Sequence, residues 1–200
     1  GNIEAATRLA RRVLARKPSH DPRLRAALAL AAAGSVREAE TIVQDLTAAH
    51  PEHTFINLVF APIVRGAIAL RLEQPEPAIE QLRTVAPYEL GFVAALAPIH
   101  WRGHSYLMMG SGRQAAEEFQ RILDHRGSDP FSPFHAVAWL GLARALTMAG
   151  EDSTSLLAYE RFLAGWKDAD SDIPVLRAAQ EEVVRCRRRA AQTPSISATT

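Results

Sequence analysis

The chain has 200 residues, and 48% of them are hydrophobic, which is enough to fill a sizeable core. Its 23 Lys and Arg residues nearly balance its 22 Asp and Glu residues, so a formal net charge of +1 gives no global attraction to nucleic acid or to an anionic membrane. The single cysteine, Cys186, excludes an internal disulfide, and no apolar run reaches the ~18 residues that a membrane-spanning helix needs.

Helical patterns alternate with short turn signals from one end of the chain to the other. The first pattern predicts one helix at about 2–17, which we interpret as the second half of a broken repeat. Four expected helix pairs follow, at 21–33 with 36–50, 53–72 with 75–85, 91–109 with 112–125, and 133–149 with 153–167. A mostly polar helix at 173–190 is typical of the cap of a helical array. Residues 193–200 are rich in Ser and Thr and are expected to form a flexible tail.

The second helix of each pair carries a small residue followed by apolar residues four and seven positions later. The small residues are Ala6, Ala39, Ala78, Ala115 and Ser155. This spacing places the three positions on one helix face. Twelve positions before the small residue, the first helix carries Ala27, Gly66, Gly103 or Ala143, where a small side chain lets a neighbouring helix approach closely. Recurrence every 33 to 40 residues predicts stacked helix pairs rather than one globular core.

The turn between the two helices of a pair also recurs. Its central positions hold Gly34, Glu73, Gly110 and Gly150. Glycine supplies the left-handed conformation that commonly ends a helix, so Glu73 is a departure from the pattern. Counting back from Ala6 places Gly1 at the same turn position. We therefore expect that the first helix of this repeat is missing and that the chain is a piece of a longer protein.

Two prolines fall within the first helices of the second and third pairs. Pro62 and Pro98 lie four and five residues before Gly66 and Gly103. Proline removes a helical hydrogen bond and kinks or restarts a helix. We therefore expect both of these helices to be long and bent.

The repeat positions resemble those of tetratricopeptide repeats. The best match is the third pair, with Gly103, Tyr106, Gly110, Ala115, Phe119 and Ile122. The runs RGAIALRLEQPEPAIEQLRTVAPYELG, YLMMGSGRQAAEEFQRILDHRG and LAYERFLAGWKDADSDIPVLRAAQEE also resemble the C-terminal repeats of large bacterial, acidobacterial-type serine/threonine kinases or winged-helix transcriptional regulators. This resemblance covers roughly 61–182 and implies a regulatory arm. Because such proteins can place a membrane span between effector and repeats, the resemblance leaves either side of the inner membrane open.

One face of the first helices is expected to line a concave groove. The predicted partner-binding residues are Phe60, Ile63, Ala67, Leu70, His100, His104, Leu107, Met108, Leu140 and Arg144. This wall is mostly apolar, which favours an extended or helical peptide with apolar anchors. Related repeats that clamp the acidic C-termini of chaperones use Lys and Asn at such positions, and those residues are missing here. The alternative is that the parent protein's own segments fill the groove.

No catalytic or metal site is predicted. His100 and His104 have the spacing of two zinc ligands, but Trp101 stands where a zinc protease has its catalytic Glu, and no third ligand is evident. The alternating carboxylates of 168–172 lack the Gly and Glu of a calcium loop. The arginines of 185–189 have no interleaved aromatic residues, so no nucleic acid is expected. Glycine-rich phosphate loops and kinase catalytic motifs are absent from the sequence.

The sequence therefore predicts an all-α fold, a tetratricopeptide-like α-solenoid of antiparallel helix pairs with a C-terminal capping helix. The predicted repeat domain covers 1–192, with a half repeat at 1–18, repeats at about 21–51, 53–87, 91–127 and 133–168, and the cap at 173–190. The predicted function is protein–protein interaction, without enzymatic activity or cofactor, as the regulatory or sensing arm of a larger bacterial signalling protein. The alternative is a purely architectural or dimerisation arm, and self-association stays open.

Overall fold

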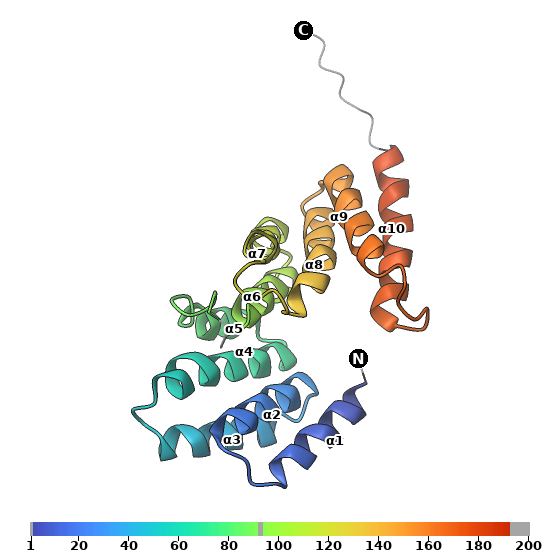
Figure 1. Cartoon of the computed structure of the whole chain (residues 1–200). Coiled ribbons are helices and arrows are strands. Elements are labelled where there is room, and N and C mark those ends of the chain that lie inside the picture. The colour runs from blue at the N-terminus through green and yellow to red at the C-terminus, as the bar shows by residue number, and fades with distance from the viewer. Residues whose placement is uncertain (1, 92–93, 193–200) are drawn as a thin grey trace.

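The computed structural model describes residues 2–91 and 94–192, and this part of the chain is all-α (Figure 1). It contains ten α-helices, one π-helical segment (η1) and no strand. In chain order the elements are α1 (Ile3–Leu14), α2 (His20–Ala32), α3 (Val36–Ala49), η1 (Phe55–Phe60), α4 (Ala61–Arg71), α5 (Pro75–Arg83), α6 (Ala97–Met108), α7 (Gly112–Asp124), α8 (Phe134–Met148), α9 (Asp152–Gly165) and α10 (Pro174–Gln192). The predicted tail at 193–200 lies outside the described residues.

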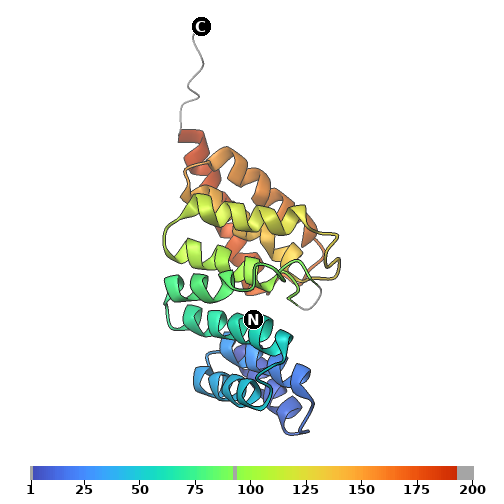
Figure 2. The same cartoon turned by 90° about the vertical axis from the view of Figure 1, so that its left-hand side faces the viewer.

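The helices are packed in consecutive order, each against its neighbours in sequence. Along one side, α2, α4, α6 and α8 also contact one another in turn. The two views in Figures 1 and 2 show that the row bends, so that α1 and the N-terminal end of α10 lie on the same side of the molecule. No helix among the described residues is long and apolar enough to cross a membrane.

All four expected turns have the same backbone geometry. The central residues Gly34, Gly110 and Gly150 have φ values of 90°, 72° and 81°, and Glu73 adopts the same left-handed conformation with a φ of 57°. In each turn the following N–H donates to the carbonyl five residues earlier, as from Ser111 to Tyr106 at 2.9 Å. This turn, which is closed by two backbone hydrogen bonds, satisfies the last carbonyls of the first helix. The predicted left-handed turn is confirmed, including the position where a glutamate replaces glycine.

The predicted close approach of paired helices is also confirmed. A Cβ atom added at Gly66 would lie 2.7 Å from Leu82, and one added at Gly103 would lie 2.8 Å from the Phe119 ring. Both contacts are closer than real Cβ atoms tolerate, so only glycine fits there without a shift of its neighbour. In the last pair, the fully buried Ser155 replaces alanine, and its hydroxyl donates to the carbonyl of Ala143 at 2.8 Å.

Pro62 and Pro98 differ in their effect on the helix that contains them, and Pro62 does not interrupt its helix. Before Pro62 the chain forms the wider π-helical turns of η1, and Ala61 N–H donates to Ile56 O as the chain enters α4 without a break. The first helix of the second pair is therefore long, as expected.

The expected helix start at 91 is wrong, because Gly91 and residues 94–96 form a bend and turns. Ala95 and Leu96 have left-handed φ values of 51° and 62°, which no α-helix accommodates. The helix α6 begins at Ala97, so Pro98 takes the second helical position, where its missing N–H costs nothing.

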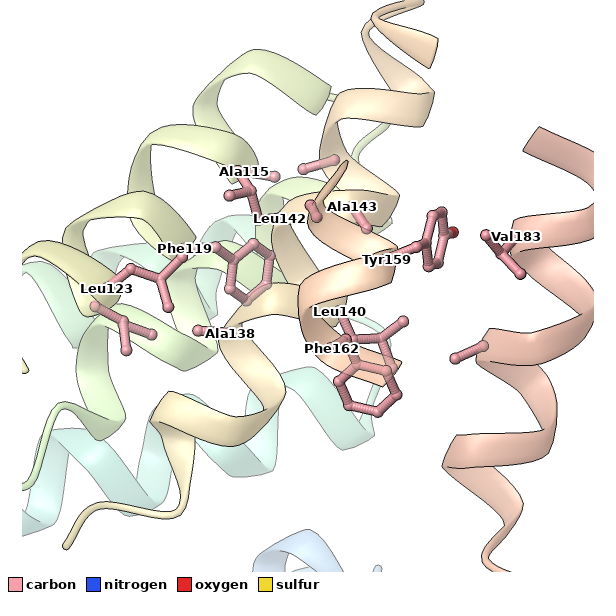
Figure 3. Packing of buried hydrophobic residues seen from close by; sticks show 14 of the residues in the cluster. Ala115, Phe119, Leu123, Ala138, Leu140, Leu142, Ala143, Tyr159, Phe162 and Val183 are labelled. Carbon is pink, nitrogen blue, oxygen red and sulfur yellow. The ribbon is translucent and has the colours of Figure 1, made fainter. Parts of the chain in front are cut away.

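Two large hydrophobic clusters and one smaller one form the core. The N-terminal cluster joins helices α1 to α4 and is rich in alanine. The C-terminal cluster joins α6 to α10 around the rings of Phe119, Tyr159 and Phe162 (Figure 3). Figure 3 shows Phe119 between α7 and α8, and Tyr159 and Phe162 on the side of α9 that faces Val183 of α10. The smaller cluster, with Val59, Ile63 and Ala97, lies between them.

Candidate protein-binding surfaces

Only part of the predicted groove is accessible. The buried members are Phe60, Ile63, Ala67, His100 and Leu140, each at most 7% exposed. The half-buried members are Leu70, His104, Leu107 and Arg144, and Met108 is 47% exposed. The five buried side chains belong to the core between helices, so they cannot contact a partner in this conformation. The register assigned them to the correct helices but not to an accessible face.

The two predicted groove histidines pack around aromatic rings of the core. The ring centroids of His100 and His104 lie 4.6 Å apart, and His100 stacks at 4.5 Å on Phe134. Burial, with a smaller contribution from the positive charge of Arg144, lowers the pKa of His104 to about 4. Burial, followed by the charge of His104, holds the pKa of His100 well below its usual range. Both imidazoles are therefore neutral at neutral pH and offer no positive charge to a partner.

These histidines also do not assemble a metal site. No group of three or more His, Cys, Asp or Glu side chains that could hold a metal ion occurs within 2–91 and 94–192. A zinc ion bound by two imidazoles would need at least one further protein ligand.

The predicted groove arginine is tied to another helix. Arg144 on α8 forms two hydrogen bonds of 2.9 Å to Glu182 on α10, and the Tyr159 hydroxyl donates to the same carboxylate at 3.0 Å. Burial, with the charge of Glu182, raises the pKa of Tyr159 above its usual range, so the phenol keeps its proton. Arg144 therefore fastens the last helix to the array, and its charge is already neutralised.

A second charged cluster fastens the irregular segment before α6. Glu89 is fully buried, and its carboxylate accepts a 2.6 Å hydrogen bond from Arg102. Arg102 also forms two 2.8 Å bonds to Glu118 on α7, while the other Glu89 oxygen faces Arg121. Every charge in this cluster has an opposite partner, so we interpret it as a structural tie. Sequence reasoning missed it because its members are up to 32 positions apart and lie in no motif.

The accessible apolar residues of the predicted groove lie at the C-terminal ends of α4 and α6, and Met148 lies at the same end of α8. We call Leu70, Leu107, Met108 and Met148 the methionine edge; Met148 is 45% exposed. Met108 and Met148 both lie five residues after the small residue of their helix, so they occupy equivalent positions in consecutive pairs. Methionine is flexible and polarisable, and surfaces rich in it adapt to varied partners.

A second accessible surface was not predicted. A cavity of about 570 Å³ lies between α7 and α9, over α8, with Trp139, Leu142 and Leu146 among the residues that line it. At its wall Leu157 is 63% exposed. Sequence periodicity shows only that these residues are apolar. It does not predict the groove, because a groove between two second helices depends on the distance between consecutive pairs.

Comparison with protein-family models, with curated protein sequences and with solved structures finds no match.

Proposed function

We propose that this chain is a protein-interaction module built as a tetratricopeptide-like α-solenoid. Four helix pairs with the same left-handed turn, two of them with a glycine at the close approach of the helices, support the repeat architecture. Stacked pairs of this kind form extended surfaces rather than a single catalytic pocket. The alternation of first and second helices then places α10 in the position of a further first helix, packed on α9, where it closes the array.

The observation that carries the proposal is the methionine edge. Met108 and Met148, which are 47% and 45% exposed, occupy equivalent positions on consecutive first helices, and Leu70 and Leu107 are half-buried. Exposed apolar side chains that gather along one edge are typical of protein-binding surfaces. Arg144, four residues before Met148, is already engaged with Glu182. A partner segment with apolar anchors fits this chemistry better than an acidic peptide.

Site-specific photo-crosslinking tests the proposal. A photoreactive residue at position 108 or 148 is expected to yield a discrete crosslinked protein in cells of the source organism. The same residue at exposed position 80 on α5 serves as the control and is expected to yield none. The double variant Met108→Glu, Met148→Glu should lose the crosslinked partner without a change in unfolding midpoint, because both side chains are exposed. Equal crosslinking at all three positions would show that the edge is not a binding surface.

The resemblance of 61–182 to bacterial kinase and regulator repeats supports a more specific proposal, a regulatory arm of a larger signalling protein. The gene that encodes the chain tests this part. An effector domain in the same reading frame would support it, and a gene that encodes only repeats would contradict it.

The second candidate function is an architectural or dimerisation arm. The methionine edge favours this function as well, because the same apolar side chains can bind a second copy of the chain. Light scattering over a concentration series separates the two, since a self-associating arm must show a mass that rises with concentration.

A further inference from the structure

The cavity between α7 and α9 has an apolar floor and polar ends. Trp139, Leu142 and Leu146 of α8 lie beneath it, and Leu157 of α9 stands at its wall with 63% of its surface exposed. Most of the Leu157 side chain is therefore not used in packing within the chain. The floor can therefore hold an apolar side chain of a bound molecule.

The two ends of this cavity carry opposite charges. As second helices of antiparallel pairs, α7 and α9 run in the same direction, so their N-terminal ends lie at one end of the cavity. Glu117, in the first half of α7, and Glu151, just before α9, line that end. Arg161, near the C-terminal end of α9, lines the other end. Within the described part of the chain, Glu117 and Arg161 have no ion-pair partner.

A second cavity continues the first one beyond its basic end. This cavity of about 480 Å³ shares Trp139 and Arg161 with the first, so the two are continuous. It adds the positive charge of Arg126 and the ring of Phe131, which is 94% exposed. Aromatic rings and arginines are the residue types enriched where proteins bind one another.

We propose that this continuous outer groove, formed by the two cavities, binds a peptide segment of a protein partner. The segment carries apolar anchors over the α8 floor, a basic residue toward Glu117 and Glu151, and acidic residues toward Arg161 and Arg126. The charge order fixes the direction in which the segment lies. The carboxylates at one end make nucleic acid a poor occupant. This inference rests on the proposed protein-binding function, but it assigns a site whose lining includes none of the residues of the methionine edge.

Selection from a random twelve-residue peptide library against the immobilised full chain tests this groove. The enriched peptides are expected to share apolar residues between a basic and an acidic residue. Their affinity for Leu157→Glu should fall by roughly tenfold or more, because that carboxylate would lie unpaired against the apolar floor. The variant Glu117→Lys, Arg161→Glu should bind the same apolar anchors without a preferred charge order, because each introduced charge is offset by the remaining Glu151 or Arg126. All three substituted side chains are exposed, so these variants are expected to fold.

The variant Met108→Glu, Met148→Glu is the matched control, because it alters other exposed apolar side chains that do not line the outer groove. Peptides that lose affinity only for this variant would overturn the outer groove and support the proposed function at the methionine edge. A mass that rises with concentration and is lowered by Leu157→Glu would show that a second copy occupies the groove, which also overturns the inference. A library that yields no enriched peptide overturns it too, whereas the proposed function is decided separately by crosslinking from position 108.

Discussion

The N-terminal and C-terminal regions use the same repeated turn but fill the space between helices differently. The N-terminal cluster contains many alanines, and its ion pairs, such as Arg65–Glu40, are partly exposed to solvent. The C-terminal cluster contains three large rings, and charged side chains such as Arg102 and Glu89 are buried beside it. Small apolar side chains let helices approach closely and bury no polar group that needs a hydrogen-bond partner. The Phe119 ring requires glycine on the facing helices, and buried charges require partners, so we expect the C-terminal region to tolerate single substitutions less well.

The largest difference is expected at the buried charge cluster. Arg102→Met removes the cation that bridges Glu89 and Glu118, and the fully buried Glu89 is then left with only Arg121, whose side chain is 43% exposed. Breaking a buried ion pair in this way typically costs about 3–5 kcal/mol of the free energy of unfolding. Urea denaturation measures this loss. The matched substitution Arg65→Met in the N-terminal region breaks a partly exposed pair and should cost less than about 1 kcal/mol. Similar losses in the two variants would show that the two regions do not differ in this respect.

The second expectation concerns acidification. The pKa of His104 is lowered from 6.5 to about 4 in the folded chain, so the unfolded chain binds more protons between these two values. The free energy of unfolding is therefore highest above pH 6.5. It decreases as the pH falls toward 4, by about 2–3 kcal/mol in total.

Chemical denaturation of wild type and His104→Leu between pH 7 and 4.5 measures this effect. The wild type should lose more stability across this range than the variant, which has no imidazole to protonate at position 104. Parallel pH profiles would contradict the assignment of the acid sensitivity to this buried histidine.

The third expectation is the strain of an added methyl group. Gly103→Ala places a Cβ atom against the Phe119 ring, and overpacking of this kind costs about 1–3 kcal/mol of the free energy of unfolding. The equivalent N-terminal position already holds the fully buried Ala27. In the Gly103→Ala background, Phe119→Leu should recover part of the loss, because the smaller side chain makes room for the methyl group. If Gly103→Ala unfolds at the same urea concentration as wild type, the ring does not restrict this position.

The local features of the fold could be predicted from sequence because they recur along the chain. The small residue, the apolar residues after it and the turn glycine define each pair without knowledge of the rest. What could not be predicted depends on depth and distance. The register placed Ile63 and Leu140 on the inner face, yet neighbouring helices cover both. Arg144 was assigned to a partner, but its partner is Glu182, 38 residues away in the same chain.

The outer groove escaped prediction for a related reason. Its wall residue Leu157 lies two positions after Ser155 and so outside the repeated apolar positions of the second helix, and periodicity gives only the side of a helix on which a residue lies. It does not give the distance between α7 and α9, on which the cavity depends. Similarly, Pro98 signalled an interruption, but whether the helix bends or begins there is decided by the left-handed Leu96 before it.

The smallest expected effect is at the one turn that departs from glycine. Glu73 holds a left-handed φ of 57°, where its Cβ atom crowds the backbone, whereas the equivalent Gly34, Gly110 and Gly150 have no such atom. Glu73→Gly should therefore raise the free energy of unfolding, by about 0.5–1 kcal/mol after the larger entropy of the unfolded glycine is subtracted. Glu73→Ala keeps the Cβ atom and removes only the carboxylate, so it should leave stability nearly unchanged. Equal gains from Gly and Ala would instead trace the effect to the charge, and the turn would then impose no backbone strain at this position.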